Sequence, residues 1–241
     1  MKKAAVIPVR WGSVRFPGKP LALIAGRPMV EWVYRRTVEA GCFDEVIIAT
    51  DDERILSAVL KFTGRAVMTS AVHRSGSERI WEVVKSEPWD LLINVQGDEP
   101  LISPLLLARV SDALEKGECP VVSAGFHNQS QADFNDENCV KVVLDKQDRA
   151  LYFSRSAIPY GDLFKGFIQH VGVYGYTRDA LEFFVRCQPQ KLEILEKLEQ
   201  LRFLEHGWRI KILISEYRSR GVDVPEDIAR IEKIISGEKD V

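Results

Sequence analysis

The chain has 241 residues, of which 46% are hydrophobic, and its 33 basic and 35 acidic residues give a formal net charge of −2. This length supports one sizeable α/β domain, or a domain with a lobe. The balanced charge provides no global basic field, so no nucleic-acid partner is expected. The sequence contains no apolar stretch long enough to span a bilayer, so no membrane association is expected either.

The cysteine pattern and the N-terminal residues bear on the cellular compartment. The four cysteines and four histidines are scattered, without C-x-x-C or zinc-ligand spacing. Reduced thiols in a cytosolic protein are the simplest account of such cysteines. Met1-Lys2-Lys3 leads directly into a short strand pattern, so we expect no signal peptide. Together these features predict a cytoplasmic protein.

The first predicted strand, residues 4–7, is followed by the most informative loop of the chain. Residues 8–20 read PVRWGSVRFPGKP, with three cations, two glycines and a hydroxyl. Glycines let backbone N–H groups approach a ligand closely, and Arg and Lys side chains neutralise phosphate oxygens. We therefore expect a nucleoside triphosphate to bind at this loop.

The loop does not match the two best-known phosphate-binding motifs. A Walker loop requires G-x-x-x-x-G-K-[ST], whereas here five residues separate Gly12 from Gly18 and Pro20 replaces the hydroxyl residue. The dinucleotide pattern G-x-G-x-x-G is absent from the loop. What remains is the pattern of a sugar nucleotidyltransferase, with a basic surface loop as the structural alternative.

Short apolar runs alternate with helix-like spacing through the next part of the chain. The strand-like runs are residues 45–50, 91–96 and 120–126, and the helix-like segments are residues 28–40, 52–62, 77–86 and 104–116. This alternation predicts an α/β fold with a mainly parallel sheet and helices on both faces. Such sheets bind ligands beyond the carboxyl ends of their strands, where the polar motifs of this chain fall.

The segment His73-Arg74-Ser75-Gly76-Ser77 precedes the third predicted helix. Ser75 or Ser77 suits the N-cap of that helix, with Glu78 in its first turn. The hydroxyls and backbone groups of this segment are also suited to reading the edge of a base.

Two aspartates at predicted strand ends are candidates for holding a divalent cation. Asp98 follows the most hydrophobic strand, beside Gly97, and Asp223 lies in the loop Gly221-Val222-Asp223-Val224-Pro225. Carboxylates together with phosphate oxygens suit Mg²⁺, which rarely receives a full protein cage. The structural alternatives are a turn role for Asp98 and a helix-capping role for Asp223. The presence of both aspartates with the basic loop favours the metal.

The second half of the chain changes character. Residues 139–144, 169–176 and 209–214 predict strands, and residues 192–205 predict a helix with four leucines on one face. The insert of residues 145–159 suggests an extension of the sheet rather than a separate domain. A last helix is expected to start near Pro225.

Polar aromatic residues and glycines concentrate in residues 152–160 and 170–176. A sugar-acid site requires a cation for the carboxylate and hydrogen-bonding groups for the hydroxyls, and Arg155, His170 and Tyr174 fit those needs. The alternative is a buried sheet with satisfied tyrosines. Glu199 and Gln200 are either solvated or directed into the site, and helical periodicity does not choose between these alternatives.

As an ordered set, these motifs resemble those of the CMP-KDO synthetase family, the 3-deoxy-manno-octulosonate (KDO) cytidylyltransferases. The resemblance runs nearly from end to end, although the N-terminal loop alone would be shared with other cytidylyltransferases. Its carriers are Ile7-Pro8-Val9-Arg10 with Ser13, Arg15 and residues 17–21, then residues 49–52, His73 with Ser75-Gly76, and residues 94–100, 154–156, 158–160, 170–176, 198–202, 221–223 and 225–227.

The resemblance implies the reaction CTP + KDO → CMP-KDO + pyrophosphate, with Mg²⁺ as cofactor, in lipopolysaccharide synthesis. It implies a cytoplasmic homodimer in which the inserted second-half strands contribute to the contact between protomers. The expected fold is a Rossmann-like nucleotidyltransferase sheet in a single domain of residues 1–241. A dimerisation and sugar-binding extension is expected around residues 145–190.

The expected site has three parts. The predicted catalytic residues are Arg10, Lys19, Asp98 and Asp223, and the two aspartates are also the predicted metal ligands. The predicted nucleotide-binding residues are Pro8, Arg10, Gly12, Ser13, Arg15, Lys19, Arg74, Ser75, Gly76 and Gln96. The predicted KDO-binding residues are Gln96, Arg155, His170, Tyr174, Glu199 and Gln200.

Departures from the family's pattern are mild and touch no predicted catalytic residue. They are Val9, where alanine is usual, Ser77 and Val224, where threonine is usual, and the less familiar Trp11, Val14 and Phe16. One rival hypothesis is the same chemistry on sialic acid or a hexose 1-phosphate, which residues 154–160 and 170–176 count against. Another is a nucleotide-binding regulatory protein without turnover, which the retention of Lys19, Asp98 and Asp223 disfavours.

Overall fold

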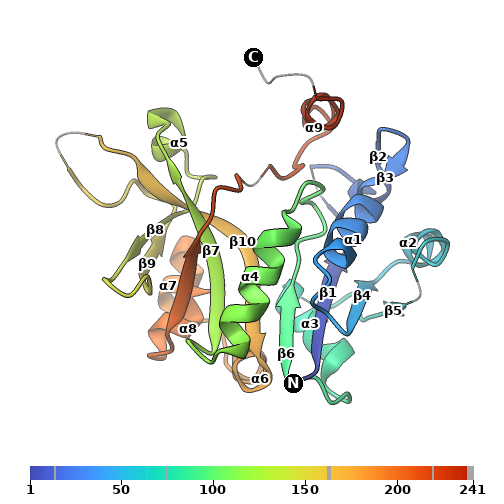
Figure 1. Cartoon of the computed structure of the whole chain (residues 1–241), viewed down its shortest axis with the longest axis horizontal. Helices are drawn as coiled ribbons and strands as arrows, with labels where there is room; N and C mark the ends of the chain where they lie inside the picture. The colour runs from blue at the N-terminus through green and yellow to red at the C-terminus, as the bar shows by residue number, and fades with distance from the viewer. Residues whose placement is uncertain (14, 64, 74, 162–163, 219, 238–241) are drawn as a thin grey trace. The chain divides into compact units, whose positions relative to one another are not determined.

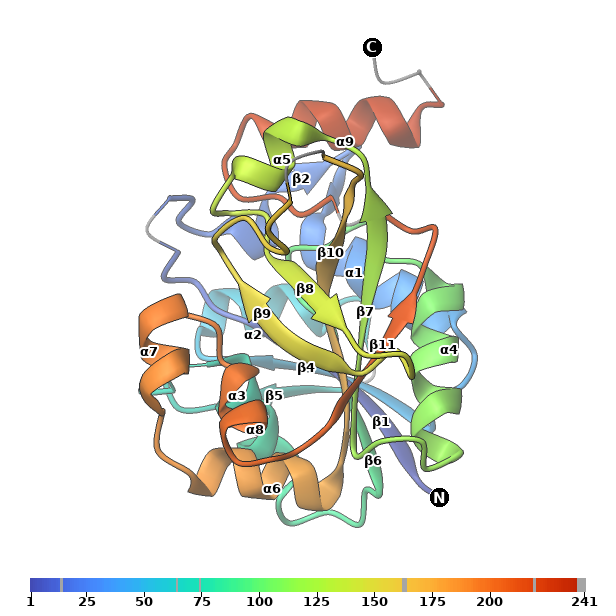
Figure 2. The same cartoon turned by 90° about the vertical axis from the view of Figure 1, so that its left-hand side faces the viewer.

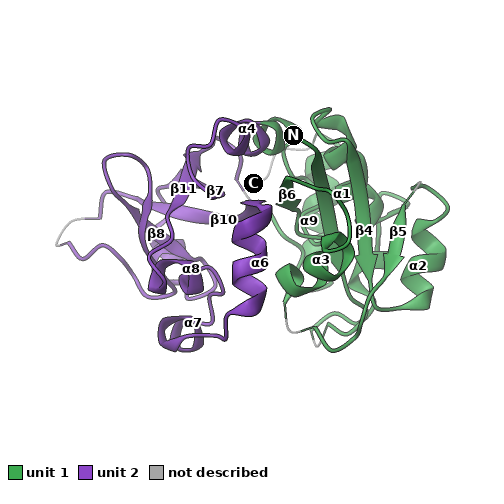
Figure 3. Ribbon diagram, turned by 90° about the horizontal axis from the view of Figure 1, so that it is seen from below, with its two compact units in different colours: residues 1–108, 219–241 green, residues 109–218 purple. Residues whose placement is uncertain are grey.

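The computed structural model describes residues 1–13, 15–63, 65–73, 75–161, 164–218 and 220–237. The chain divides into two compact units, coloured separately in Figure 3. Unit 1 consists of Met1–Ala108 together with Ser219–Val241, and unit 2 is Arg109–Arg218. Unit 1 is therefore built from both ends of the chain. The predicted single domain with an extension around residues 145–190 stays a prediction.

Unit 1 contains a parallel sheet in the order β6-β1-β4-β5 (Figure 1). Its strands are β1 (Lys3–Val9), β4 (Glu45–Thr50), β5 (Ala66–Met68) and β6 (Leu91–Asn94). Their pairings are all parallel, for example Ile7 with Ile48. Residues 4–7 and 47–50 are fully buried, as expected for parallel strands covered on both faces. Because the strands are parallel, the polar loops that follow them lie at the same edge of the sheet.

Three helices of unit 1 follow these strands: α1 (Met29–Glu39), α2 (Glu53–Val59) and α3 (Gly76–Val84). The carboxylate of Asp52 caps α2 by accepting a hydrogen bond from the backbone N–H of Arg54 (2.9 Å). The hydroxyl of Ser75 caps α3 by accepting from the N–H of Glu78 (3.3 Å). The predicted capping role of Ser75 is confirmed, whereas Ser77 is buried within the first turn of the helix.

The C-terminal helix α9 (Asp227–Ile235) packs on the hairpin of β2 (Leu23–Ile24) and β3 (Arg27–Pro28), as Figure 1 shows. Ala25 and Gly26 make the turn with positive φ angles of 47° and 77°, which is the conformation of a two-residue type I′ hairpin. The buried contact consists of Ile24, Met29, Val222 and Ile231. This small core fixes the C-terminal segment beside the short 3₁₀ helix η1 (Lys19–Leu21), which follows the N-terminal loop.

Unit 2 contains a mixed sheet, visible in Figure 2. Its strands are β7 (Val121–Asn128), β8 (Lys141–Leu144), β9 (Ala150–Ser154), β10 (Phe167–Thr177) and β11 (Ile210–Ile214). β10 pairs antiparallel with β7 and β8, and β11 pairs parallel with β7. The insert of residues 145–159 contains β9, which pairs antiparallel with β8.

The helices of the second half are short. They are α5 (Gln131–Asn135), α6 (Arg178–Arg186), α7 (Lys191–Glu196) and α8 (Leu201–Glu205), and the longer α4 (Pro104–Glu115) contains the boundary between the units. Within the described part of the chain, a helix with the length and apolar character needed to cross a membrane does not occur.

The predicted helix over residues 192–205 is wrong. Lys197 adopts a left-handed conformation (φ 54°, ψ 45°) that ends α7, and α8 starts only at Leu201. Leu195 is 67% exposed, whereas Leu198 and Leu201 are buried, so the leucines do not share one face. Residues 197–200 therefore form a connection between two short helices, and Glu199 and Gln200 lie on that connection.

Candidate nucleotide site

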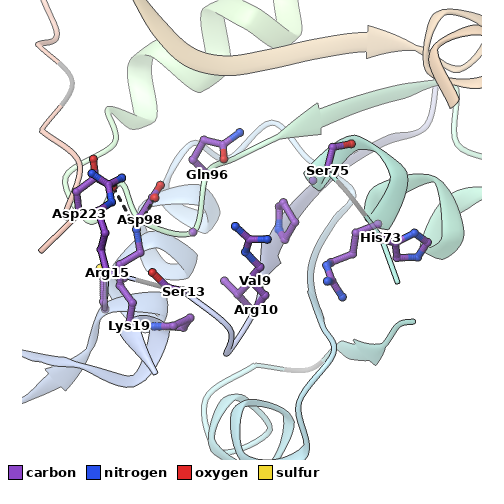
Figure 4. A pocket seen from close by; sticks show the side chains of 16 residues that line it. Val9, Arg10, Ser13, Arg15, Lys19, His73, Ser75, Gln96, Asp98 and Asp223 are labelled. Carbon is purple, nitrogen blue, oxygen red and sulfur yellow. Dashed lines mark hydrogen bonds and ion pairs between the residues drawn. The ribbon is translucent and has the colours of Figure 1, made fainter. Parts of the chain in front are cut away.

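A cavity of about 410 Å³ lies within unit 1 at the carboxyl ends of β1 and β6. Its lining residues, drawn in Figure 4, are Pro8, Val9, Arg10, Ser13, Arg15, Lys19, Pro20, Met29, His73, Ser75, Gly76, Arg79, Gln96, Gly97, Asp98 and Asp223. Eight of the ten predicted nucleotide-binding residues line it. Of the other two, Arg74 lies outside the described residues. Gly12 is exposed and is not among the described residues that line the cavity.

The N-terminal loop contributes three cations to the lining of the cavity, Arg10, Arg15 and Lys19. Arg10 and Arg15 are exposed, and the hydroxyl of Ser13 accepts a hydrogen bond from the backbone N–H of Phe16 (3.3 Å). Lys19 is the first residue of η1, and Pro20 at the start of that helix costs no hydrogen bond because its N–H would have no helical partner. The loop thus presents charged groups that can meet several phosphate oxygens.

The two predicted metal ligands lie near one another, across the ammonium group of Lys19 (Figure 4). Lys19 Nζ is 2.7 Å from Asp98 Oδ2 and 3.7 Å from Asp223 Oδ1. Arg15 Nη2 also contacts Asp223 Oδ1, at 2.9 Å. Two cations and two carboxylates from three distant parts of the sequence therefore converge at one end of the cavity.

The C-terminal segment is held in place by backbone contacts. The N–H of Val222 donates to the carbonyl of Asp98 (2.9 Å), and Lys19 Nζ donates to the carbonyl of Val222 (2.8 Å). Asp227 Oδ2 accepts from the N–H groups of Asp223 (2.8 Å) and Val224 (3.1 Å). Asp227 thus accepts hydrogen bonds from backbone N–H groups just before α9. The carboxylate of Asp223 does not cap this helix and instead contacts Arg15 and Lys19.

The donor set fits Mg²⁺ better than a metal that needs a complete protein cage. Within the described ranges, no group of three or more His, Cys, Asp or Glu side chains is arranged to hold a metal ion by itself. Asp98 and Asp223 supply hard oxygen ligands, which lie 2.7 and 3.7 Å from the same Lys19 ammonium group. Mg²⁺ commonly binds one or two carboxylates and completes its shell with water and phosphate oxygens.

Lys19 is less accessible than its place in a glycine-containing loop suggests. From the sequence we expect this loop to be exposed, and the side chain of Lys19 departs from that expectation. The side chain is only 13% exposed, and its ammonium group links Asp98 to the carbonyl of Val222. Lys19 therefore contributes to the structure of unit 1 as well as to its charge.

Glycines allow two close approaches that shape the cavity. A Cβ on Gly97 would lie 2.3 Å from Cγ1 of Val9, and a Cβ on Gly76 would lie 3.1 Å from Cγ of Pro8. Real Cβ contacts do not occur at 2.3 Å, so the loop after β6 needs glycine at position 97 to lie against β1. Gly76 similarly lets the first turn of α3 approach Pro8 and the cavity.

Arg79 lines the cavity and was not predicted. The residue is buried, with 4% of its surface exposed. Its guanidinium binds Asp51 Oδ2 (2.7 Å), the hydroxyl of Thr69 and the carbonyl of Ser70 (3.4 Å). On a helix, residues four apart share a face, so the Ser75–Arg79 spacing is the signal that would have placed Arg79 beside the capping serine. His73, also in the lining, pairs with Glu82.

The predicted KDO-binding residues other than Gln96 lie in unit 2. The guanidinium of Arg155 donates to the carbonyls of Glu196 (2.8 Å), Glu137 (3.0 Å) and Lys197 (3.4 Å). These contacts orient Arg155 firmly and use part of its donor capacity. Its role toward a sugar carboxylate stays a prediction.

His170 and Tyr174 lie together in unit 2, with ring centres 5.3 Å apart. His170 Nε2 is hydrogen-bonded to the hydroxyl of Ser123 (2.9 Å). Burial, followed by the nearby Tyr176 and Glu199, raises the pKa of Tyr174 well above its ordinary value. Glu199 is therefore close to this pair. Gln200 is 3% exposed, and its Nε2 has no hydrogen-bond partner within the described structure.

Acid should destabilise the protein through His170. Burial lowers the pKa of this histidine from 6.5 to about 3, so below pH 6.5 the unfolded chain binds a proton that the folded chain does not. The free energy of unfolding therefore decreases as the pH falls from 6.5 toward 3. At pH 5 this loss amounts to about 2 kcal/mol. Urea unfolding at pH 7 and pH 5 should show this extra loss in the parent and not in His170→Gln. An equal loss in both would contradict the assignment.

A parallel α/β sheet whose first strand leads into a basic loop, facing a pair of carboxylates, defines the class of the protein as a Rossmann-like nucleotidyltransferase. The family model described as cytidylyltransferase matches residues 4–212. The relatives include two proteins that carry the name 3-deoxy-manno-octulosonate cytidylyltransferase. That of Syntrophobacter fumaroxidans is 44% identical over 245 residues, 98% of each chain. That of Vibrio vulnificus is 44% identical over 249 residues, 98% of this chain and 99% of the relative.

A solved structure adds agreement in three dimensions. The structure of a CMP:2-keto-3-deoxy-manno-octonic acid synthetase complexed with CTP matches with a TM-score of 0.93 and 37% identity, over 98% of this chain and 99% of that one. The chain belongs to the 3-deoxy-manno-octulosonate cytidylyltransferase family, also called the CMP-KDO synthetases. The predicted family and fold class are thereby confirmed.

Proposed function

We propose that this chain transfers the cytidylyl group of CTP to KDO, giving CMP-KDO and pyrophosphate for lipopolysaccharide synthesis. The observation that carries the proposal is the convergence of Arg15, Lys19, Asp98 and Asp223 at the cavity. The names of the relatives, which span nearly the whole chain, support KDO as the acceptor.

In the proposed reaction the anomeric hydroxyl oxygen of KDO attacks the α-phosphorus of CTP. A new oxygen–phosphorus bond forms, the bond from the α-phosphorus to the bridging oxygen breaks, pyrophosphate leaves, and the hydroxyl proton passes to solvent water. Arg10, Arg15 and Lys19 neutralise charge as it develops on the triphosphate. Asp98 and Asp223 would hold Mg²⁺, which when bound neutralises phosphate charge and lowers the pKa of a bound hydroxyl.

We propose that the groups that recognise cytosine lie in the part of the cavity away from Asp98 and Asp223. Pro8, Ser75 and Gly76 line the cavity, and Ser75 lies away from Asp98 and Asp223 in Figure 4. The first turn of α3 presents backbone groups close to Pro8. Such groups form directional hydrogen bonds, which suit the recognition of a base edge better than charge does.

The proposed assembly is a cytoplasmic homodimer formed through the second-half strands. Unit 2 exposes apolar side chains on β9 and α7, including Leu151 (61%), Ile194 (63%) and Leu195 (67%). Ser154 of β9 hydrogen-bonds Glu196 of α7 (2.7 Å), so these elements are adjacent. Analytical ultracentrifugation of the full chain would test the assembly.

A pyrophosphate-release assay tests the reaction directly. CTP and Mg²⁺ would be supplied with KDO, a sialic acid or a hexose 1-phosphate in turn, and with UTP replacing CTP in a parallel series. Release with CTP and KDO supports the proposal. Preferential release with another acceptor would favour a related transferase, and CTP binding without release would favour a regulatory nucleotide-binding protein.

Arg155→Lys tests the acceptor side of the proposal. Lysine keeps the charge but loses the two-pronged geometry that matches a carboxylate, and a charge-assisted hydrogen bond is worth about 1.5–3 kcal/mol. We therefore expect the KM for KDO to rise on the order of tenfold or more, with a much smaller change for CTP. Steady-state kinetics with each substrate varied separately would decide. A lower melting temperature with both KM values unchanged would assign Arg155 to the scaffold alone.

A further inference from the structure

Trp11 is an unusual residue in the N-terminal loop, and its contacts reach beyond the loop. Trp11 is the second residue after β1 and the neighbour of Arg10, and it is not among the described residues that line the cavity. Its carbonyl accepts hydrogen bonds from the N–H groups of Ser13 (2.9 Å) and Gly18 (3.2 Å). The backbone of Trp11 thus closes the loop that presents Ser13 and Arg15 to the cavity.

The indole ring of Trp11 covers the other end of that loop. A Cβ on Gly18 would lie 3.0 Å from Cη2 and 3.1 Å from Cζ2 of the ring. Gly18 has a φ of +72°, a conformation that glycine adopts without strain. It directly precedes Lys19, so the ring packs against the residue from which η1 starts.

The guanidinium of Arg54 also contacts the ring of Trp11. The guanidinium carbon lies 3.4 Å from the centre of the Trp11 ring. The same guanidinium binds both carboxylate oxygens of Asp52, through Nε (2.8 Å) and Nη2 (2.6 Å). Asp52 is the N-cap of α2, so the cation over the ring is anchored to the start of a helix. The hydrogen bond from Arg54 also lowers the pKa of Asp52 below its ordinary value, which keeps the anchor ionised.

We propose that Trp11 and Arg54 form a positioning pair that holds the phosphate-binding loop in its ligand-ready shape. Neither residue is among the described residues that line the cavity, so the pair acts through Arg10, Ser13, Arg15 and Lys19. A loop already ordered before binding loses less conformational freedom when the ligand arrives, and affinity rises accordingly. The inference rests on the proposed function, because it takes a nucleoside triphosphate as the ligand.

The test measures CTP binding by isothermal titration calorimetry, without acceptor, together with steady-state kinetics. Trp11→Leu and Arg54→Gln should each weaken CTP binding about three- to tenfold, the range that a cation–π contact of this kind supports. The double variant should be no weaker than the single ones, because both remove the same contact. KM for CTP should rise similarly, with KM for KDO unchanged, and Trp11→Phe should restore most of the affinity.

Arg27→Gln is the matched control. Arg27 lies over the ring of Trp32 at 5.4 Å, a second cation–π contact within unit 1 but outside the loop. This control should leave CTP binding unchanged. Should Trp11→Leu fail to fold, Arg54→Gln carries the test, since the side chain of Arg54 is 58% exposed.

The outcomes separate this inference from the proposed function. A parent chain that binds no CTP would overturn the proposed function and the inference with it. A parent that binds CTP, with the Trp11 and Arg54 variants binding as tightly, would overturn the inference alone. Additive losses in the double variant would show two independent effects and would also overturn the pair.

Discussion

Asp98→Asn is expected to reduce pyrophosphate release by about 10²–10³-fold, the loss typical of removing one group that stabilises charge in a transition state. Asp98 Oδ2 lies 2.7 Å from Lys19 Nζ at the end of the cavity where Asp223 also faces. Asparagine keeps the shape and one acceptor oxygen but loses the negative charge. If the aspartates hold Mg²⁺, the Mg²⁺ concentration needed for half-maximal rate should rise as well. Asp223→Asn should behave in the same way.

Stability distinguishes this role from that of a turn residue. Asp98 is partly exposed (37% of the side chain), so loss of its ion pair should lower the free energy of unfolding by less than about 1 kcal/mol. Magnesium titrations of activity and urea unfolding of each variant would be compared with Asp112→Asn, which removes an exposed carboxylate on α4. A loss of stability as large as the loss of activity, without any change in magnesium dependence, would return Asp98 and Asp223 to purely structural roles.

Lys19→Met should lower both turnover and stability. The ammonium group donates to Asp98 (2.7 Å) and to the carbonyl of the fully buried Val222 (2.8 Å). Methionine retains most of the aliphatic stem, so the change removes mainly the charge and its donors. Loss of a cation at the triphosphate should reduce turnover more than about tenfold. Loss of charge-assisted hydrogen bonds should lower the free energy of unfolding by about 1–3 kcal/mol.

Lys61→Met provides the comparison, because Lys61 is an exposed lysine near the end of α2. Initial rates at saturating CTP and urea unfolding would be measured for both variants. Near-normal turnover of Lys19→Met, even with reduced stability, would show that Lys19 has only a structural role, which is to connect the C-terminal segment to η1.

Some of the fold follows from local pattern, and residues 45–50 show why. After Glu45 this run is continuously apolar or β-branched, and it forms β4 with the predicted bounds because a strand buried on both faces needs no alternation. The predicted helix over residues 192–205 failed because leucine spacing does not reveal the left-handed Lys197 that ends α7. The insert of residues 145–159 was expected to extend the sheet, and β9 within it does pair with β8, but its bounds were not predicted because a five-residue segment carries little periodic signal.

The candidate site was predictable in its residue types but not in its internal contacts. The charges of Arg15, Lys19, Asp98 and Asp223 are visible in the sequence, and the tendency of parallel sheets to gather ligands at strand ends places most of them together. Their pairing is a tertiary result, because Arg15 and Asp223 are 208 residues apart. The spacing from Ser75 could have placed Arg79 near the site, but its burial is recognisable only once its partner Asp51 is placed.

The discontinuous composition of unit 1 bears on the order in which the protein can form during translation. Residues 109–218 make up unit 2 and leave the ribosome before the segment that carries Asp223 and α9. Domains generally fold as units as the chain is made. Synthesis of unit 2 is therefore complete while unit 1 still lacks its C-terminal segment. The nucleotide cavity, which needs Asp223 opposite Arg15 and Lys19, is therefore among the last features of the nascent chain to be completed.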